Sequence, residues 1–540
     1  MKFHSAAAAA LRDHGIDVLF GVLGDANMYI ANSFHQEWGG RFYSSAHESG
    51  AVLMANGYAA ASGRVGAATV THGAIPNAVS ALLDGVRGRY PVIVLAGDTA
   101  AADTFNLQNV PQRDIVMPTG AGFESARSPR SIGEDVAVAV RRAKLERRPI
   151  VLNVPADFQA RDVEYAKVEP GAAPSPTWAP RPEAVEEAVG LISMGRRPVV
   201  LAGRGASSPH ARRSLVRLAQ RVGAPLATTL RAKDLFRGEP FNLGICGTLA
   251  TPAGLDALAK ADCLLVFGAS LNPLTADAGD LLAGKRIVQC DIDPCAFGRY
   301  FPVDIAITGD SGQVADALVE LLDRADVRPA GYRGTGLAER LAAVHADAAD
   351  RRAAPDTLGL ADALARVNDL VDPARTLVID GGRFSHLALQ TMSVPEPAAY
   401  VHALNVGQIG LSVGYGIGAA LGRPGHPTLV VVGDGGFMLG GLAEFNTAVR
   451  HKVDLVVAVM NDGAYGAEYY RFVGRSLDPS LTMFDWPELA AVADALGGTG
   501  VTVRTHADFG RVRAVLAERD RPVLIDVKLD PSAIPDPGRH

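Results

Sequence analysis

The stretch of residues 428–468 decides the fold, and it reads TLVVVGDGGFMLGGLAEFNTAVRHKVDLVVAVMNDGAYGAE. An apolar run of the kind that forms a buried strand, 428–432, ends in Gly-Asp-Gly-Gly. A helical stretch follows, and a second apolar run, 455–460, ends in Asn461-Asp462. The pattern predicts two parallel strands joined by a helix, with oxygen-bearing side chains at the edge where open α/β sheets bind ligands.

The residue types at this edge suit a diphosphate held with a metal ion. Glycines beside Asp434 allow the backbone to approach phosphate oxygens closely, and the following helix N-terminus favours negative charge. Carboxylate and phosphate oxygens are the ligands that Mg²⁺ prefers. The sequence therefore predicts a Mg²⁺–diphosphate site at this point.

The combination of GDG, a helix, and a strand ending in ND resembles the diphosphate and metal motif of thiamine-diphosphate-dependent enzymes. This group includes acetolactate synthases, benzoylformate decarboxylases and pyruvate decarboxylases. The resemblance implies thiamine diphosphate and Mg²⁺ as cofactors, and Asp434 as the first metal ligand. The residues that it implies for cofactor binding here are Gly433, Asp434, Gly435, Gly436 and Tyr465.

Composition excludes several other classes of protein. The chain has 540 residues, of which 48% are hydrophobic and 20% charged, and its net charge is −6. This is an ordinary globular composition, without the basic surplus of a nucleic-acid-binding protein. There is no run of about 18 apolar residues, so no membrane span is expected.

The N-terminal sequence and the cysteines favour a cytoplasmic protein. The start, MKFHSAAAAALRDHG, mimics a signal peptide, but Arg12 and Asp13 interrupt the apolar run too early, and the alanines fit a first helix. The four cysteines lack CxxC spacing, so we expect buried free thiols in a reducing compartment. They are Cys246, Cys263, Cys290 and Cys295.

Short apolar runs alternate with helical stretches along the whole chain, which predicts an α/β protein of doubly wound parallel sheets. Linkers rich in Pro, Ala or Gly are expected near 169–182 and 325–336. With the resemblance, we expect three domains: pyrimidine-binding (1–168), central (183–325) and diphosphate-binding (355–540). The expected strands are near 18–22, 67–70, 91–96 and 149–153, then 198–202, 263–267, 286–291 and 304–307, and finally 376–380, 428–432, 455–460 and 522–527.

The resemblance assigns cofactor activation to Glu48, in the turn Ala46-His47-Glu48-Ser49-Gly50 before a helix of small residues. In the family, an acid at this place bonds N1′ of the aminopyrimidine. A carboxyl in a dry pocket has a raised pKa and can carry a proton near neutral pH. The structural alternative is a solvated helix-start Glu, favoured by the helix dipole.

A second resemblance lies at Asn405-Val406-Gly407-Gln408-Ile409. The family places a glycine whose carbonyl meets the 4′-amino group, and two residues later an apolar side chain that bends the cofactor. Gly407 and Ile409 occupy these positions, which implies catalysis by holding reacting atoms together. The alternative is an ordinary turn glycine with a core isoleucine.

The second metal ligand is left open between two neighbouring residues. The family spacing of 27 residues counted from Asp434 selects Asn461, whereas matching the strand end backwards from Tyr465-Gly466 selects Asp462. The stretch GFMLGGLAEFNTA is one residue longer than the family pattern, and we favour Asp462, because strand register shifts less readily than a helix-entry loop. The third ligand is then the backbone carbonyl of Ala464, or that of Gly463 if Asn461 is the second ligand.

Four further side chains are expected near the reacting carbonyl. Asp25 and Glu468 resemble acids of the pyruvate-decarboxylase subgroup, and His72 resembles the active-site His of benzoylformate decarboxylase. Gln108 resembles the Gln of acetolactate synthases. For each, the alternative is a capping or loop hydrogen bond. Because these features belong to different subgroups, the acyl donor and acceptor stay undetermined.

The central block contains Gly203-Arg204-Gly205-Ala206 after a strand, and Asp291 and Asp293 after another. GxGA alone is a weak nucleotide signal. Structural use is favoured over flavin binding, so FAD is retained as the alternative cofactor.

Together these features predict a thiamine-diphosphate- and Mg²⁺-dependent 2-oxo acid decarboxylase or carboligase, similar to acetolactate synthase. The resemblance implies an ylid and an enamine intermediate, an aldehyde or ketone acceptor, and a homodimer or homotetramer. The alternatives are C–C cleavage or ligation without decarboxylation as in benzaldehyde lyase, a flavoenzyme of the pyruvate-oxidase kind, and a catalytically silent relative.

Overall fold

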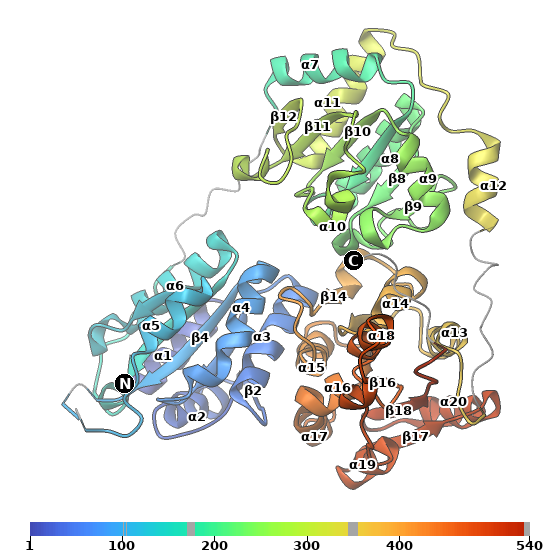
Figure 1. Cartoon of the computed structure of the whole chain (residues 1–540). Helices are drawn as coiled ribbons and strands as arrows, with labels where there is room; N and C mark the ends of the chain where they lie inside the picture. Colours follow the sequence, from blue (N-terminus) through green and yellow to red (C-terminus); the bar gives the residue numbers. More distant parts are fainter. Residues whose placement is uncertain (101, 104, 170–178, 344–354, 534–540) are drawn as a thin grey trace. The chain divides into compact units, whose positions relative to one another are not determined.

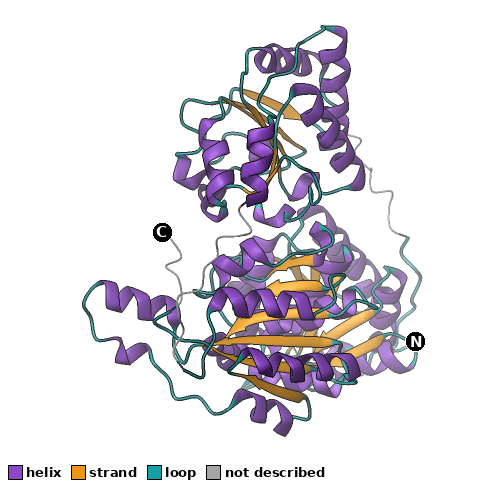
Figure 2. Ribbon diagram, turned by 90° about the vertical axis from the view of Figure 1, so that its right-hand side faces the viewer, coloured by secondary structure: helices purple, strands orange, loops and turns teal. Residues whose placement is uncertain are grey.

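The computed structural model describes residues 1–533 except 101, 104, 170–178 and 344–354, and it contains three six-stranded parallel sheets (Figure 1). The expected α/β fold class is confirmed. The first sheet has the order β2-β1-β3-β4-β6-β5, the second β12-β11-β10-β7-β8-β9, and the third β14-β13-β15-β16-β18-β17. Helices lie on both sides of the strands (Figure 2).

The strands have the following bounds: β1 Val18–Gly21, β2 Arg41–Ser44, β3 Gly66–Val70, β4 Val92–Asp98, β5 Gly122–Ser125, β6 Pro149–Pro155, β7 Pro198–Ala202, β8 Leu226–Thr228, β9 Asn242–Ile245, β10 Cys263–Phe267, β11 Arg286–Asp291, β12 Ile305–Thr308, β13 Thr376–Ile379, β14 Tyr400–His402, β15 Thr428–Gly433, β16 Leu455–Asn461, β17 Thr499–Val503 and β18 Val523–Lys528.

The α-helices have the following bounds: α1 Phe3–Asp13, α2 Met28–Gln36, α3 Glu48–Ser62, α4 Val79–Gly88, α5 Gln112–Val116, α6 Ile132–Glu146, α7 Pro182–Ser193, α8 Pro209–Val222, α9 Pro252–Lys260, α10 Pro273–Ala276, α11 Ser311–Arg324, α12 Thr335–Ala343, α13 Leu360–Leu370, α14 Ser385–Thr391, α15 Ser412–Gly422, α16 Asp434–Gly436, α17 Leu442–Arg450, α18 Gly466–Gly474, α19 Leu489–Ala495 and α20 Phe509–Glu518.

The inner strands form where the sequence is continuously apolar. β15 (TLVVVG) and β16 (LVVAVMN) are buried along nearly their whole length, because helices cover both faces of a parallel sheet. Each of the twelve expected strands matches an observed one to within one or two residues.

The strands that the sequence did not predict are β2, β5, β8, β9, β14 and β17, and all but β8 lie at the edge of a sheet. β2 is exposed or half-buried throughout, and β17 alternates between half-buried and buried residues. Edge strands are short and partly polar, so they lack the apolar run that marks a central strand.

The first and third sheets have identical connectivity. In each sheet, the first strand of the chain lies next to an edge, and the second strand forms that edge. The third and fourth strands then extend the sheet on the other side of the first strand. The fifth strand forms the far edge, and the sixth fills the place between the fifth and the fourth. The crevice at the switch in direction therefore lies at the ends of β1 and β3 in the first sheet and of β13 and β15 in the third. The first and third sheets belong to one compact unit of the chain, and the second sheet belongs to another.

Several smaller predictions concern other parts of the chain. The alanine-rich N-terminus forms α1, and all four cysteines are free, but Cys295 is exposed, so the expectation of four buried thiols is wrong there. Of the linker expected at 325–336, residues 325–334 contain no helix or strand, whereas α12 already begins at Thr335. Most of the linker expected at 169–182 lies outside the described residues. Within the described ranges, every helix is too short or too polar to cross a bilayer.

Candidate functional site

Asp434 and Asp462 lie together at the carboxyl ends of β15 and β16. The two strands are adjacent and parallel, with Gly433 paired to Met460, so the residues that follow them meet at one edge. The Ala464 N–H donates to Asp462 Oδ1 over 3.2 Å and also to the Asp434 carboxylate. Because one backbone N–H donates to both carboxylates, the two acids lie close together.

This pair is electrostatically costly without a cation. Burial raises the pKa of Asp434 to about 6. Burial and then the charge of Asp434 raise the pKa of Asp462 to about 7, against the opposing effect of Arg383. Within the described ranges, no three His, Cys, Asp or Glu side chains converge on a common point. A hard cation that completes its shell with backbone, phosphate or water oxygens fits this donor set, as Mg²⁺ does.

Asn461, the alternative ligand, already has structural partners. Its Nδ2 donates to Asp526 Oδ1 over 2.8 Å, and its Oδ1 accepts from the Gly463 N–H over 3.2 Å. Both polar atoms of the buried amide thus bond within the β16–β18 edge.

A continuous helical run begins at Asp434 and contains a π-helical segment, Phe437–Gly441, before α17. A π turn accommodates one more residue than an α turn, and such turns are frequent at functional sites. The N-terminus of this run passes close to an aromatic ring, since a Cβ on Gly435 would lie 2.4 Å from Tyr465 Cε1. A side chain at this position would require the ring to move, and a helix N-terminus of this kind favours an anion.

Sequence reasoning missed two side chains at this edge, Trp486 and Arg383. Trp486 Nε1 donates to Asp434 Oδ2 over 2.8 Å, and its ring stacks on Phe484 at 4.8 Å. The buried Arg383 guanidinium donates to the Gly466 carbonyl and acts electrostatically on Asp462. Trp486 stands in a loop without a motif, whereas Arg383 directly follows the Asp380-Gly-Gly turn after β13, a signal that was not used.

A third residue that the sequence analysis missed, Asp380, bonds to the backbone that follows the Gly407–Ile409 turn. This acid follows β13, is fully buried, and accepts bonds from the Gly410 N–H at 2.9 Å and Ser412 Oγ at 2.8 Å. Gly407 has a φ of +74°, a conformation that favours glycine. The Ile409 side chain is partly exposed. The signal available in the sequence was an Asp-Gly-Gly directly after a strand.

Glu48 is the first residue of α3, at the carboxyl end of the first sheet. Its side chain is partly exposed, and Oε2 accepts a hydrogen bond of 3.0 Å from Asn77 Nδ2. Asn77 belongs to the short 3-10 helix Ile75–Ala78, which follows His72.

The structure also gathers three other expected residues at this edge of the first sheet. The loop of Asp25 packs on the loop of His72, because a Cβ on Gly24 would lie 2.5 Å from Thr71 Oγ1. Gln108 Nε2 donates to the His72 carbonyl over 3.4 Å. His72 is buried, whereas Asp25 and Gln108 are exposed.

Glu468 stands apart from these groups. It lies in the first turn of α18, half exposed, and pairs with Arg471 at 3.5 Å. Within the described residues, no hydrogen bond or ion pair joins it to Asp25, Glu48, His72 or Gln108.

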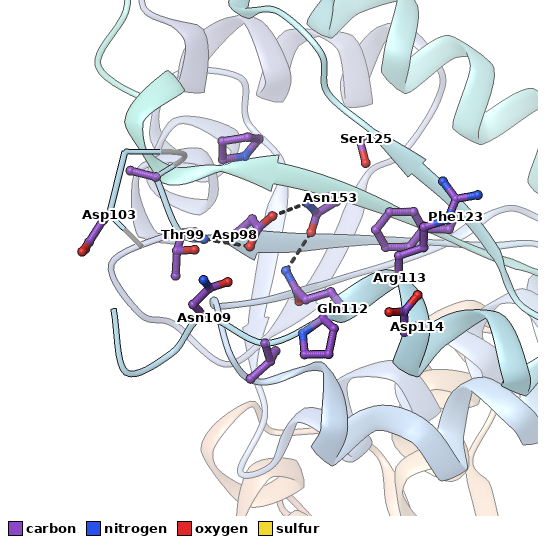
Figure 3. A pocket seen from close by; sticks show the side chains of 14 residues that line it. Asp98, Thr99, Asp103, Asn109, Gln112, Arg113, Asp114, Phe123, Ser125 and Asn153 are labelled. Carbon is purple, nitrogen blue, oxygen red and sulfur yellow. Dashed lines mark hydrogen bonds between the residues drawn. The ribbon is translucent and has the colours of Figure 1, made fainter. Parts of the chain in front are cut away.

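A polar cavity of about 400 Å³ adjoins the first-sheet residues, at the ends of β4 and β6 (Figure 3). Hydrogen bonds link residues of its lining: Asn153 Nδ2 donates to Asp98, and Gln112 Nε2 donates to Asn153 Oδ1 and to the Gly97 carbonyl. Gly97 in turn packs on the backbone of His72, where an added Cβ would lie 3.1 Å from the His72 nitrogen. The charged residues of the lining are Asp98, Asp103, Arg113 and Asp114.

The glycine turn of the central sheet is explained by packing. Gly203 and Gly205 lie against Gly268, and a Cβ on Gly203 would lie 2.2 Å from the Gly268 carbonyl oxygen. The Asp291 and Asp293 side chains accept backbone N–H groups two residues further on. These contacts give each residue a structural role, and FAD binding stays an untested prediction.

Comparison with known proteins finds matches over most of the chain. Three family models match it: Thiamine pyrophosphate enzyme, N-terminal TPP binding domain, over residues 1–117; central domain, over residues 185–318; and C-terminal TPP binding domain, over residues 380–527.

Similar proteins include a probable decarboxylase, an acetyltransferase and an acetolactate synthase. A probable 2-ketoarginine decarboxylase of Pseudomonas aeruginosa is 28% identical over 499 residues, which cover 90% of this chain and 87% of the relative. A sulfoacetaldehyde acetyltransferase of Rhodobacter capsulatus is 27% identical over 557 residues, covering 96% and 92%. An acetolactate synthase large subunit of Corynebacterium glutamicum is 25% identical over 543 residues, covering 96% and 86%. By the three domain matches and by its three parallel sheets, this chain belongs to the thiamine pyrophosphate enzyme family.

Proposed function

We propose that this chain is a Mg²⁺- and thiamine-diphosphate-dependent enzyme that decarboxylates a 2-oxo acid and releases the acyl unit as an aldehyde or joins it to an acceptor carbonyl. The observation that carries the proposal is the pair Asp434–Asp462, two carboxylates that share the Ala464 N–H at the end of adjacent parallel strands.

The residues that would hold the metal and the diphosphate come from this edge. Asp434, Asp462 and the Ala464 carbonyl would bind Mg²⁺, and the backbone from Gly433 to Gly436 would bind the diphosphate. When bound, thiamine diphosphate supplies a carbon nucleophile for the carbonyl carbon of the substrate and accepts the electrons left by CO₂. The chain itself must orient the cofactor, move protons and exclude water.

Two observations support Asp462 over Asn461 as the second ligand. Asn461 uses both polar atoms of its side chain in bonds to Asp526 and Gly463. The π-helical segment 437–441 is a place where the helix takes up one additional residue, which accounts for a spacing of 28 rather than 27 from Asp434.

Glu48 and Ile409 would face the aminopyrimidine. The Glu48 carboxyl would hold and release the proton at N1′, and the Ile409 side chain would support the bent form of the cofactor. Asp25, His72 and Gln108 share one cluster of loops, so they would line the substrate side of the site. Glu468, exposed on α18 of the third domain, is a further candidate proton donor.

The assembly that we propose is a homodimer or homotetramer in which the first and third domains of different chains complete each site. Dimer formation in solution would be measured by light scattering of the full chain at several concentrations.

The test is a binding measurement followed by a substrate panel. Thiamine diphosphate should bind tightly only with Mg²⁺, and EDTA should release it. CO₂ release should then be measured for 2-oxo acids with apolar, acidic and cationic side chains, with and without an added aldehyde. The cationic class is included because three carboxylates and one guanidinium line the cavity near His72, and because one relative is named for 2-ketoarginine. Absence of Mg²⁺-dependent cofactor binding would overturn the proposal.

A further inference from the structure

Two buried carboxylates, Asp84 and Glu444, occupy equivalent places in the first and third domains. Asp84 lies on α4, which joins the third and fourth positions of the first sheet. Glu444 lies on α17, which joins the third and fourth positions of the third sheet. Both side chains are almost wholly buried, at 0% and 3% exposure.

Asp84 bonds to the turn that carries Ile409 in the third domain. Its Oδ1 accepts from the Asn405 N–H over 3.0 Å, its Oδ2 accepts from Asn405 Nδ2 over 2.7 Å, and the Val406 N–H also bonds to the carboxylate. The hydroxyl of the buried Tyr415 is a further donor to Oδ2. The backbone just before Gly407 is therefore anchored by an acid of the other domain.

Glu444 bonds to the turn that carries Glu48 in the first domain. Its Oε1 accepts from the His47 N–H over 3.1 Å, and its Oε2 accepts from the Ala46 N–H over 3.3 Å. A Cβ on Gly50 would lie 1.9 Å from Glu444 Oε1, so the carboxylate lies directly against the start of α3. At the end of α17, Arg450 Nη2 donates to the Ser44 carbonyl over 3.0 Å.

The two turns begin helices that pack backbone to backbone. Glu48 starts α3, and α15 begins three residues after Ile409. A Cβ on Gly57 would lie 2.2 Å from the Tyr415 carbonyl oxygen, and one on Gly418 would lie 1.9 Å from the Met54 carbonyl oxygen. Glycines thus let the two helix backbones approach closely, and the carboxylates bond to the turns before the N-terminal ends of this packed pair.

We propose that Asp84 and Glu444 are a matched pair of positioning residues, each holding the turn that presents a cofactor-facing side chain of the opposite domain. Glu444 acts through Glu48, and Asp84 acts through Ile409. The inference rests on the proposed function for the roles of Glu48 and Ile409. Its physical basis is that ionised acceptors bond backbone N–H groups strongly when buried, and that a catalytic geometry is sensitive to shifts of about 1 Å.

The first experiment uses the cofactor-free protein and hydrogen–deuterium exchange. Glu444→Gln keeps the size of the side chain but turns one acceptor into a donor, so exchange at Ala46 and His47 should rise about tenfold or more, with residues 405–406 unchanged. Asp84→Asn should give the opposite pattern. Asp310→Ala is the matched control, because Asp310 also accepts two backbone N–H groups at a helix start, those of Gly312 and Gln313, but within the central sheet's domain. Unchanged protection of both turns in both variants would overturn the inference.

The second experiment measures deuterium exchange at C2 of bound thiamine diphosphate, at saturating cofactor and Mg²⁺. Each single variant should slow this exchange about tenfold or more, with cofactor affinity changed less than about threefold. In a Glu48→Gln background, Glu444→Gln should add less than about twofold, and Asp84→Asn should behave likewise in an Ile409→Ala background. If the fold-changes of the two substitutions in a pair instead multiply, the two residues act independently, because independent residues have additive free energies. That result would overturn the inference that Glu444 acts through Glu48, or Asp84 through Ile409.

The outcomes separate this inference from the proposed function. If the wild type binds no cofactor, the proposed function fails, and exchange at the two turns still decides whether the carboxylates hold them. If the cofactor binds and its C2 proton exchanges at the same rate in the variants, the positioning role alone is wrong. Should Asp84→Asn fail to fold, Tyr415→Phe removes one bond to the same carboxylate and should give a smaller loss of protection at residues 405–406.

Discussion

Replacing Asp462 by asparagine should stabilise the cofactor-free protein while removing its response to Mg²⁺ and thiamine diphosphate. The carboxyl pKa of Asp462 is raised from 3.8 to about 7 by burial and by the neighbouring charge of Asp434. Between pH 3.8 and about 7, the Asp462 carboxyl is therefore protonated in the folded protein but ionised in the unfolded chain. Stability contributed by this group falls as pH rises through that window, and the penalty is complete above pH of about 7.

The size of the effect follows from the shift. One pKa unit corresponds to about 1.4 kcal/mol, so raising the pKa from 3.8 to about 7 costs about 4 kcal/mol as an upper value. Because the side chain is partly exposed, we halve this figure to about 2 kcal/mol at pH 8. The asparagine Oδ1 can still accept the Ala464 N–H, so the substitution removes charge without removing that bond.

The assay is thermal unfolding in EDTA and in saturating Mg²⁺ and thiamine diphosphate. In EDTA at pH 8 the Asp462→Asn midpoint should exceed the wild-type midpoint by a few degrees, and the difference should shrink as the pH is lowered toward 4. With ligands at about 100 times Kd the wild type should gain about 2.7 kcal/mol, and the variant should gain little. The order of stability of the two proteins should therefore reverse.

Asn461→Ala is the matched comparison at the neighbouring position. It removes the bonds to Asp526 and Gly463, so it should destabilise the protein by about 1–3 kcal/mol in both conditions and keep the ligand response. A less stable Asp462→Asn protein in EDTA would refute the electrostatic reasoning. Loss of the ligand response in Asn461→Ala, with retention in Asp462→Asn, would assign the metal to Asn461 instead.

Three further predictions concern the cofactor and its environment. Glu48→Gln should retain bound thiamine diphosphate but slow C2 proton exchange by about 10²–10⁴-fold; a loss below about threefold would make Glu48 a helix-start residue only. Mixing inactive Glu48→Gln with inactive Asp434→Ala under subunit exchange should restore activity if two chains form each site, and a fully active monomer would contradict this. Because Trp486 donates to Asp434, adding Mg²⁺ and cofactor should change tryptophan fluorescence in the wild type but much less in Trp486→Phe.

The parts of the fold that the sequence predicts are those in which local composition alone decides the structure. β15 and β16 are buried on both faces and must be apolar along their whole length, so their runs stand out. β2 has the sequence RFYS and lies at an edge with one side near solvent, so hydrogen bonds to β1 rather than its own composition make it a strand. The Asp434 loop was predictable because glycine, acid and strand end are contiguous.

The rest of the candidate site depends on contacts between distant segments. Trp486 reaches Asp434 across 52 positions of sequence, and Asp84 reaches Asn405 across 321. A tryptophan in a loop or an acid on a helix carries no mark of such a partner. Asp380 was the intermediate case, since its position after a strand placed it at the correct edge although its bonds to Gly410 and Ser412 could not be foreseen.

The repeated connectivity of the first and third sheets explains why the missed acids have a common logic. A parallel sheet with this strand order places one helix after its edge strand and another after its third strand. In this chain the helices after the edge strands, α3 and α15, pack against each other. The helix after the third strand of each domain, α4 or α17, then lies beside the turn that precedes α15 or α3 of the other domain. The segment that leads into that helix has backbone N–H groups that no bond within the helix satisfies, and a buried carboxylate can accept them strongly. Asp84 and Glu444 supply such a carboxylate at the two turns. The same bonds that engage these backbone groups also fix the positions of Ile409 and Glu48.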